Sequence, residues 1–420
     1  MLEPSSGDFM DIRADELVNL IYEKSREAFN IIKRYVHRTP VDLSRSFSQM
    51  TEYKVFLKYE NLQKTGSFKV RGALFKVYNL MLQGVRGVVA ASTGNHAQGV
   101  AFAAQIFGLR AVIVMPLTAS IAKVEATRSY GAEVILHGTV YDEAETFAKR
   151  ISEEQGLAFV HPFDDVDVIA GQATIAWELL EQLEDFDAIV VPIGGGGLVS
   201  GIISVLKRVK PEIKIIGVEA EHAPKMYESI RSGKPVTISP KPSIADGLVT
   251  KKPGEITFAI VSRFIDDIVT VSEEEIAMAI HLLLERGKVL AEGAGAASLA
   301  ALISGKVKLR KGMRVVALVT GGNMDATALY RVLLRGLLNQ GRIARLRGEV
   351  LDVPGSLERV LSVIASHRGN VLDIKHDRYE LRASPWHAVV EILVEVPSRK
   401  VAQEILRDLK VKGFDFELID

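Results

Sequence analysis

Short apolar segments alternate with longer amphipathic ones from about residue 50 to residue 330. The short segments are rich in Val, Ile and Ala, which is typical of buried parallel strands. The longer segments place apolar residues at helical spacing, as in 120–130, which ends before Gly131, and in 169–183. The pattern predicts an α/β domain with an open, mostly parallel sheet covered by helices. Strands are expected at 55–59, 88–91, 111–115, 133–136, 188–193, 215–219 and 314–320.

An acidic, helix-forming segment at residues 15–35 precedes this domain, and we expect it to pack on the outside. The N-terminus lacks a basic region followed by an apolar stretch, and no apolar run is long enough to span a bilayer. The sequence therefore predicts neither a secretion signal nor a membrane partner.

The pattern resets near the C-terminus, after a basic stretch that we interpret as a linker at 341–348. The order beyond it is βαββαβ, which is the ferredoxin-like arrangement. This unit, 349–420, shows no obvious acid or base for catalysis, so binding or regulation is the expected role. Its expected strands are 349–353, 371–374, 388–396 and 414–418, and its helices contain 357–364 and 401–409.

The composition narrows the possible functions. Lys plus Arg equals Asp plus Glu at 52 each, so no net positive field favours nucleic acid as a partner. The chain has 0 Cys, which excludes disulfides, thiolate metal sites and cysteine nucleophiles and fits a reducing, cytoplasmic compartment. Its 420 residues allow about two to three domains.

A glycine loop follows the expected strand at 188–193. Four consecutive glycines let the backbone approach a ligand, and their free amides with the next helix start form a site for phosphate. The loop consists of Gly194, Gly195, Gly196 and Gly197, followed by Leu198.

A dinucleotide site is the alternative interpretation of this loop. Gly195 and Gly197 could begin a G-x-G-x-x-G fingerprint, and Glu219 ends the next strand, where a ribose-binding acid would lie. The third glycine position is Ser200, so the fingerprint is imperfect.

A second loop, at 91–98, lies between an expected strand and an expected helix. Its side chains can cap the helix, and its amides suit a carboxylate. His96 could act as a general base, but a single His beside a helix start is more often a structural hydrogen-bonding residue. The loop contains Ser92, Thr93, Gly94, Asn95 and His96.

A third segment, 65–72, places Lys69 between Phe68 and Val70. If this lysine points inward, partial desolvation lowers its pKa and frees an amine nucleophile. A solvated surface lysine is the alternative.

These three segments, in this order, resemble the fold type II family of pyridoxal 5'-phosphate enzymes, and most closely its threonine dehydratases. SFKVRGA at 67–73 is similar to the cofactor-lysine motif, STGNHAQG at 92–99 to the substrate loop and GGGGL at 194–198 to the phosphate cup. TGGN at 320–323 is similar to the loop that meets the pyridine nitrogen. The match spans residues 30–340. It implies a catalytic domain at 1–340, with a small subdomain at roughly 60–165 inserted in the large one.

The resemblance implies a role for each site residue. Lys69, beside Phe68, holds the cofactor aldehyde as a Schiff base and removes the substrate α-proton after release. Either Lys69 or the cofactor phosphate protonates the leaving hydroxyl. Asn95 hydrogen-bonds the ring phenolic oxygen, amides around Thr93 grip the substrate carboxylate, and the glycine loop binds phosphate.

Thr320 is implied to face the ring nitrogen. A carboxylate there would keep the nitrogen protonated, whereas a hydroxyl leaves it neutral. A neutral ring stores carbanion charge less well, which favours elimination over transamination. The family often has serine here, so threonine retains the hydroxyl.

The nearest competing activity is that of serine racemase, which has a serine where this chain has Thr93 and an asparagine where it has Phe163. Neither matches, so racemisation is disfavoured. The related metal site maps onto Glu219, Ala223 and Lys225. A protonated lysine cannot ligate a cation, and its charge could replace the ion, so we expect no divalent metal there.

The C-terminal unit resembles the amino-acid-binding ACT domain through DVPGSL at 352–357 and GNVLDI at 369–374. Gly355 would let the backbone approach an effector, and Asn370 could fix its polar end. The resemblance implies isoleucine as effector, with valine, serine or threonine as alternatives, bound at a seam between two copies in a homodimer or homotetramer.

We therefore expect an ammonia-lyase that converts L-threonine, and L-serine less well, to the 2-oxo acid. Serine racemase, another β-eliminating or β-replacing enzyme, and an amino-acid sensor with an incidental catalytic domain are the alternatives. Lys69 weighs against the sensor.

Overall fold

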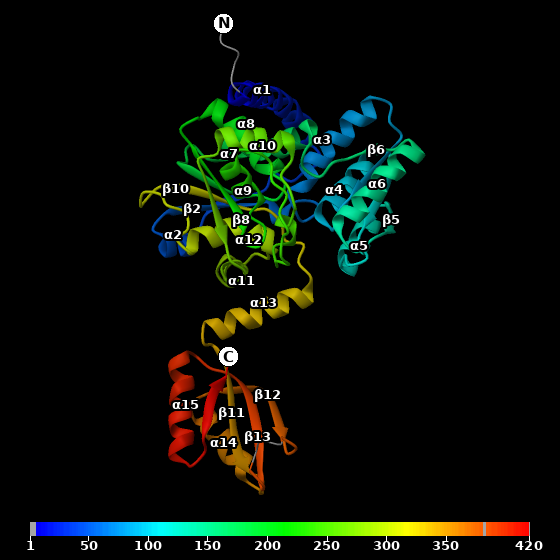
Figure 1. The fold of residues 1–420 in the computed structure, drawn as a ribbon. Coiled ribbons are helices and arrows are strands. Elements are labelled where there is room, and N and C mark those ends of the chain that lie inside the picture. The colour runs from blue at the N-terminus through cyan, green and yellow to red at the C-terminus, as the bar shows by residue number, and fades with distance from the viewer. Residues whose placement is uncertain (1–5, 381–383, 420) are drawn as a thin grey trace. The chain divides into compact units, whose positions relative to one another are not determined.

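The computed structural model describes residues 6–380 and 384–419, and it divides into two compact units, Met1–Asp325 and Ala326–Asp420 (Figure 1). Each unit has its own apolar core. The boundary lies before the helix α13 (Ala326–Asn339), which belongs to the second unit.

A six-stranded sheet forms the centre of the first unit, in the order β1-β2-β10-β7-β8-β9. All neighbouring strands are parallel except β1 and β2, which pair antiparallel. This confirms the predicted open, mostly parallel α/β sheet. Its strands are β1 (Val41–Leu43), β2 (Lys54–Tyr59), β7 (Ala188–Pro192), β8 (Lys214–Ala220), β9 (Asp267–Val271) and β10 (Arg314–Val319).

A second, four-stranded parallel sheet has the order β5-β4-β3-β6 and lies between residues 87 and 159. Its strands are β3 (Gly87–Ala91), β4 (Arg110–Met115), β5 (Glu133–Leu136) and β6 (Ala158–Phe159). Its position in the chain fits the small subdomain expected at 60–165.

Helices cover both sheets, and α7, α8 and α10 lie on the opposite side of the large sheet from α12 (Figure 1). The N-terminal helix α1 packs on α7, α8 and α10, as expected for an outer helix. The helices are α1 (Ser6–Ile32), α2 (Arg45–Thr51), α3 (Lys69–Leu82), α4 (Asn95–Phe107), α5 (Ile121–Ser129), α6 (Tyr141–Gln155), α7 (Val166–Gln182), α8 (Gly197–Val209), α9 (Lys225–Ser232), α10 (Glu255–Phe264), α11 (Glu273–Leu282) and α12 (Gly293–Ile303), with short turns η1 (Glu60–Leu62), η2 (Asp246–Leu248) and η3 (Leu283–Gly287).

The second unit contains an antiparallel sheet of order β12-β13-β11-β14. The strand and helix order is the predicted βαββαβ. Its elements after α13 are β11 (Ile343–Leu351), α14 (Ser356–Ser366), β12 (Asn370–Asp377), β13 (His387–Glu395), α15 (Arg399–Val411) and β14 (Phe416–Ile419).

The predicted linker at 341–348 is wrong, because most of it forms β11, a central strand paired with both β13 and β14. Three apolar residues of this segment are buried, namely Ile343, Ala344 and Leu346, and the last two belong to the core of the second unit. Arg345 is exposed. The basic residues of this segment led to the prediction of a linker, although its apolar residues face the core as part of a strand.

The described helices include none with the length and apolar character needed to cross a bilayer.

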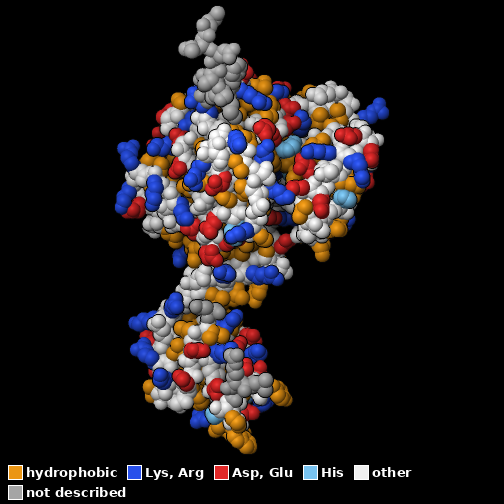
Figure 2. Space-filling view, viewed as in Figure 1, with side chains coloured by type: hydrophobic (Ala, Val, Ile, Leu, Met, Phe, Trp, Pro, Cys, Tyr) orange, Lys and Arg blue, Asp and Glu red, His pale blue; other side chains and the backbone are white. Residues whose placement is uncertain are grey.

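Basic and acidic side chains are interspersed on the face shown in Figure 2, in keeping with the formal net charge of +0. The surface in that view has no extended patch of one sign.

A buried ion cluster joins α3 to α7 and to the end of β2. The Arg71 guanidinium donates to Glu60 at 2.7 and 2.8 Å and to Glu178 at 2.7 Å. Lys58 Nζ donates to Glu178 at 2.6 Å and to the Thr39 carbonyl at 2.8 Å. Burial opposes ionisation of Arg71, but the two glutamates raise its pKa above the ordinary value. Each charge in the cluster is therefore paired.

We expect Arg71→Ala to lower the free energy of unfolding of the first unit by about 3–5 kcal/mol, because it leaves two buried carboxylates without their main partner. Urea titration followed by Trp177 fluorescence and circular dichroism measures this change. Arg128→Ala is the control, since Arg128 and Glu125 form an exposed pair within α5 and its loss costs less than about 1 kcal/mol. Equal effects of the two substitutions would contradict the cluster's role.

Candidate active site

The predicted site residues lie where parallel strands end and helices begin. Lys69 and Asn95 are the first residues of α3 and α4, Gly196 is the N-cap of α8, and Thr320 directly follows β10. Helix N-termini direct free N–H groups and positive partial charge toward this edge of the sheets. Three of these four segments begin a helix and the fourth ends a strand. The helix starts suit an anionic ligand.

Lys69 is half-buried and points inward, which is the first of the two arrangements left open by the sequence. Its Nζ donates to the Pro162 carbonyl at 2.8 Å and lies 5.4 Å from the Phe68 ring centroid. Burial lowers the pKa of Lys69 to about 8, and the nearby Glu292 carboxyl opposes that shift. The amine is therefore far more available as a nucleophile at neutral pH than that of a solvated lysine.

The glycine loop forms a close-fitting backbone cradle. A Cβ at Gly195 would lie 2.3 Å from the Phe163 ring, and one at Gly194 would lie 2.8 Å from the Gly247 carbonyl. Gly196 has a φ of +100°, which a residue with a Cβ rarely adopts. In the described chain, the N–H groups of Gly194 to Gly197 donate to no acceptor. The cradle fits an anion such as phosphate.

The loop at 92–96 presents free amides beside Asn95. Gly94 N donates to Ser92 Oγ at 3.0 Å, while the N–H groups of Thr93, Asn95 and His96 have no acceptor among the described residues. A Cβ on Gly94 would lie 2.6 Å from the Lys123 side chain. This arrangement suits a carboxylate.

His96 is buried, and its Nε2 lies 2.9 Å from the Val160 carbonyl. Burial, together with Lys69, lowers the pKa of His96 to about 3. The ring is therefore neutral and held by a backbone carbonyl, which favours the structural interpretation over the general base.

Thr320 is buried, and its hydroxyl donates to the Ala294 carbonyl at 3.3 Å. Its own carbonyl accepts from Phe68 N at 3.1 Å, and a β-bridge joins Ser67 to Gly321. The end of β10 is thus tied to the segment that carries Lys69.

Glu292 is a site residue that sequence reasoning missed. This buried N-cap of α12 accepts from Asn95 Nδ2 at 2.5 Å through Oε1, while its Oε2 has no partner in the described chain. Asn95 Oδ1 in turn accepts from Asn323 Nδ2 at 2.8 Å. Burial, with Asp246, raises the pKa of Glu292 to about 7. Its only sequence signal is an acid between apolar residues and a Gly-Ala helix start.

The dinucleotide alternative does not fit. Glu219 is fully buried and accepts from Met226 N at 3.0 Å and Tyr227 N at 2.8 Å, in addition to its ion pair with Lys225. Its carboxylate has no free face for a ribose, because backbone and ammonium groups already occupy it.

A phosphorylated aldehyde fits the arrangement. The loop amides of Gly194–Gly197 would hold its phosphate, and Lys69 would hold its aldehyde carbon. Several buried polar atoms near Lys69 have no partner in the described part of the chain, which is unusual unless a ligand supplies one. They are Thr65 Oγ1, Ser67 Oγ, His96 Nδ1 and Glu292 Oε2.

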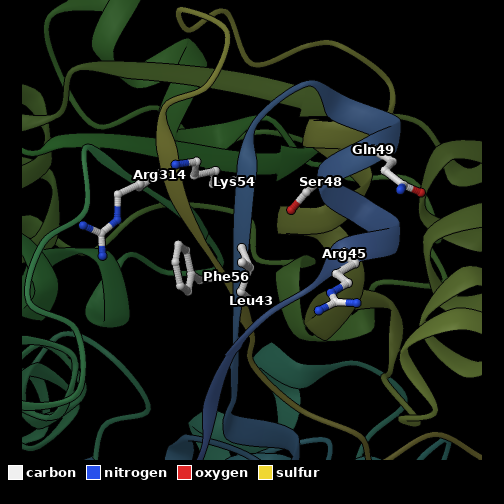
Figure 3. Close-up of a pocket in the computed structure, with 7 residues that line it drawn as sticks. All are labelled: Leu43, Arg45, Ser48, Gln49, Lys54, Phe56 and Arg314. Carbon is white, nitrogen blue, oxygen red and sulfur yellow. The ribbon is translucent and has the colours of Figure 1, made fainter.

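A separate open hollow of about 510 Å³ shares no residue with this site (Figure 3). Lys54 and Arg314 begin the parallel strands β2 and β10. The hollow therefore lies at the amino ends of these strands, whereas Thr320 follows the carboxyl end of β10. It is lined by Leu43, Arg45, Ser48, Gln49, Lys54, Phe56 and Arg314.

Residues 32–321 match the family model described as pyridoxal-phosphate dependent enzyme. The chain is 46% identical over 398 residues to the L-threonine ammonia-lyase of Thermotoga maritima, covering 94% of this chain and 99% of that protein. Among solved structures, maize serine racemase aligns with a TM-score of 0.71 and 37% identity over 76% of this chain and 98% of that one. A processed threonine deaminase isoform 2 from Solanum lycopersicum aligns with a TM-score of 0.70 and 37% identity over 76% and 92%.

Both the family model and the full-length similarity agree with the resemblance found in the motifs. The glycine cradle, the inward Lys69 and the partnerless polar atoms around it accommodate the cofactor that gives the family its name. The chain belongs to the family of pyridoxal-phosphate-dependent enzymes.

Proposed function

We propose that this enzyme is a threonine ammonia-lyase that converts L-threonine to 2-oxobutanoate and ammonia, and L-serine to pyruvate less well. The observation that carries the proposal is the inward Lys69 amine, placed near both the phosphate cradle and the carboxylate loop. The near full-length similarity to an L-threonine ammonia-lyase supports the substrate.

Each residue has a task in this reaction. Amides of Thr93, Asn95 and His96 bind the substrate carboxylate, and Lys69 Nζ takes the α-proton. The bound cofactor supplies an electron sink for the pair left by that proton. The β-hydroxyl then leaves as water with a proton from Lys69 or from the cofactor phosphate, and the released enamine takes up water to give 2-oxobutanoate and ammonia.

Thr320 favours elimination. Thr320 would face the ring nitrogen of the bound cofactor, and its neutral hydroxyl would not keep that nitrogen charged as a carboxylate would. The cofactor would then be a weaker electron sink, which would favour prompt loss of the β-hydroxyl over transamination.

Racemisation is disfavoured by the same site. Phe163, where serine racemase has asparagine, packs its ring against Gly195 and offers no hydrogen bond there. Thr93 is exposed and stands where the racemase has a serine base. Assay of D-serine beside ammonia release separates the two activities.

The second unit senses an amino acid in our proposal. Gly355, with a φ of +87°, caps α14 and has open space beside it, and the adjacent Ser356 hydroxyl is buried without a partner among the described residues. Asn370 is the first residue of β12, and its Nδ2 donates to Glu395 Oε2 at 3.4 Å. These groups suit the amino and carboxylate ends of a free amino acid such as isoleucine, which we propose as the effector in a cytoplasmic homo-oligomer.

Lys69→Ala should lower ammonia release from threonine by at least about 10²–10⁴-fold, because the residue is both cofactor anchor and base. A coupled ammonia assay measures this, with circular dichroism to check the fold. Lys64→Ala, at an exposed position in the same segment, is the matched control. Near-normal turnover in Lys69→Ala would rule out the mechanism.

Glu292→Gln should shift cofactor attachment to lower pH by about one pH unit or less. The Glu292 carboxylate raises the pKa of Lys69, so its loss disfavours the ammonium and leaves the free amine available at lower pH. Groups facing Glu292 are Asp246, Lys123, Asn95 and Lys69. Visible absorbance during reconstitution at a series of pH values measures the shift.

Glu255→Gln is the control for this titration, since Glu255 is 63% exposed and pairs with Lys252 on the surface. An unchanged pH profile in Glu292→Gln would mean that Glu292 does not influence the amine.

A chain ending at Asp325 should stay active and lose any isoleucine response. This end is preferred to one near Arg345, because Arg345 lies inside β11. Coupling between effector and substrate is typically worth about 1–3 kcal/mol, or about 5- to 150-fold in affinity. Kinetics with isoleucine and light scattering compare the two chains, and a drop from tetramer to dimer is expected. An unchanged response in the shorter chain would remove the regulatory assignment.

A further inference from the structure

Lys225 Nζ lies at the centre of a set of oxygen atoms. It is 2.8 Å from Glu219 Oε1, 2.8 Å from the Ile193 carbonyl, 3.0 Å from the Leu248 carbonyl and 3.3 Å from the Ala223 carbonyl. Lys225 and Glu219 are both 0% exposed. A buried ammonium surrounded only by oxygens occupies the kind of position that proteins give to a bound cation.

Lys225 Nζ must be a protonated ammonium group in this setting. All four neighbours accept hydrogen bonds, and a neutral amine would direct its lone pair at one of them. Glu219 also accepts from Met226 N and Tyr227 N, so two backbone N–H groups and the ammonium converge on its side chain. Burial lowers the pKa of Lys225, and Glu219 opposes that shift.

Two of the four oxygens, the carbonyls of Ile193 and Leu248, belong to segments that shape the phosphate cradle. Ile193 directly precedes Gly194, and Leu248 follows Gly247, whose carbonyl would lie 2.8 Å from a Cβ on Gly194. Met226, the next residue after Lys225, lies 3.0 Å from the position of a Cβ on Gly196. The ammonium therefore ties both sides of the cradle to the start of α9.

We propose that Lys225 is a tethered cation that positions the cofactor-phosphate loop in place of a metal ion. Removal of its side chain then opens a site for a free monovalent cation of ammonium size. Oxygens at 2.8–3.3 Å are too distant for Mg²⁺ or Ca²⁺, which bind oxygen at about 2.0–2.1 and 2.3–2.6 Å. The inference rests on the family's cofactor and is independent of which amino acid the enzyme deaminates.

The test measures the dissociation constant of pyridoxal phosphate from cofactor-free protein by absorbance. Tetramethylammonium chloride, whose cation is too large for the site, is replaced at constant ionic strength by potassium, ammonium or magnesium chloride. Wild-type protein should bind the cofactor equally well in every salt. A saturable gain with any of them would overturn the proposal.

Lys225→Ala should bind the cofactor about 10- to 100-fold more weakly in tetramethylammonium, as when a positioning group beside a ligand site is lost. Potassium or ammonium should restore most of this loss, and magnesium should not. Lys225→Met should stay weak in every salt, because its side chain fills the space without a charge. Wild-type affinity of Lys225→Ala in tetramethylammonium, or no response to potassium and ammonium, would overturn the proposal.

Lys207→Ala is the matched control. Lys207 donates to Asp266 at 2.7 Å and to the Ile213 carbonyl at 3.1 Å, at the other end of β8 from the cradle. Its removal should leave cofactor affinity unchanged in every salt, and an equal loss there would count against the proposal.

A double variant, Glu219→Gln with Lys225→Met, keeps the proposal testable if Lys225→Ala does not fold. No buried charge is left unpaired in it, so folding should be retained. Its cofactor binding should be weak and independent of salt. Wild-type affinity in this double variant would show that the charge does not position the loop.

Discussion

The buried ion cluster around Arg71 is the constraint on which the active site depends. Arg71 lies two residues after Lys69 on α3, and its guanidinium is held by Glu60 from η1, directly after β2, and by Glu178 from α7. Since each charge is costly without the others, only one arrangement of these three elements satisfies all of them. The start of α3 is thereby fixed, and the direction of Lys69 with it.

Around this fixed point, the site is defined by polar groups that the chain does not satisfy itself. The amides of Gly194–Gly197, those of Thr93 and Asn95, and the free oxygen of Glu292 all point to bound groups. Proteins normally pair such groups when they bury them, so these groups fit the ligands that the proposed reaction requires. Where no ligand is needed, as at Lys225, the chain pairs its buried charges completely.

The carboxyl groups near the site divide into two kinds. Glu219 and Glu60 accept several hydrogen bonds and face a cation, so their role is structural. Glu292 has one polar partner and an unpaired oxygen, and burial raises its pKa to about 7. The pKa of a buried glutamate thus depends on how many donors surround its carboxyl group.

The sequence alone determined the α/β class, the βαββαβ order of the second unit and the cofactor family, because these follow from local periodicity and from contiguous motifs such as GGGGL at 194–198. The catalytic roles of Lys69, Asn95 and Thr320 stay predictions that the geometry accommodates. The sequence misled at 341–348, where a basic composition hid the alternation of β11. The sequence did not indicate Glu292 as a site residue, because its hydrogen bond partner Asn95 is 197 residues away in the chain. It could suggest that Lys225 replaces an ion, but only the fold brings the carbonyls of Ile193 and Leu248 around its ammonium, because such contacts join segments that no local pattern relates.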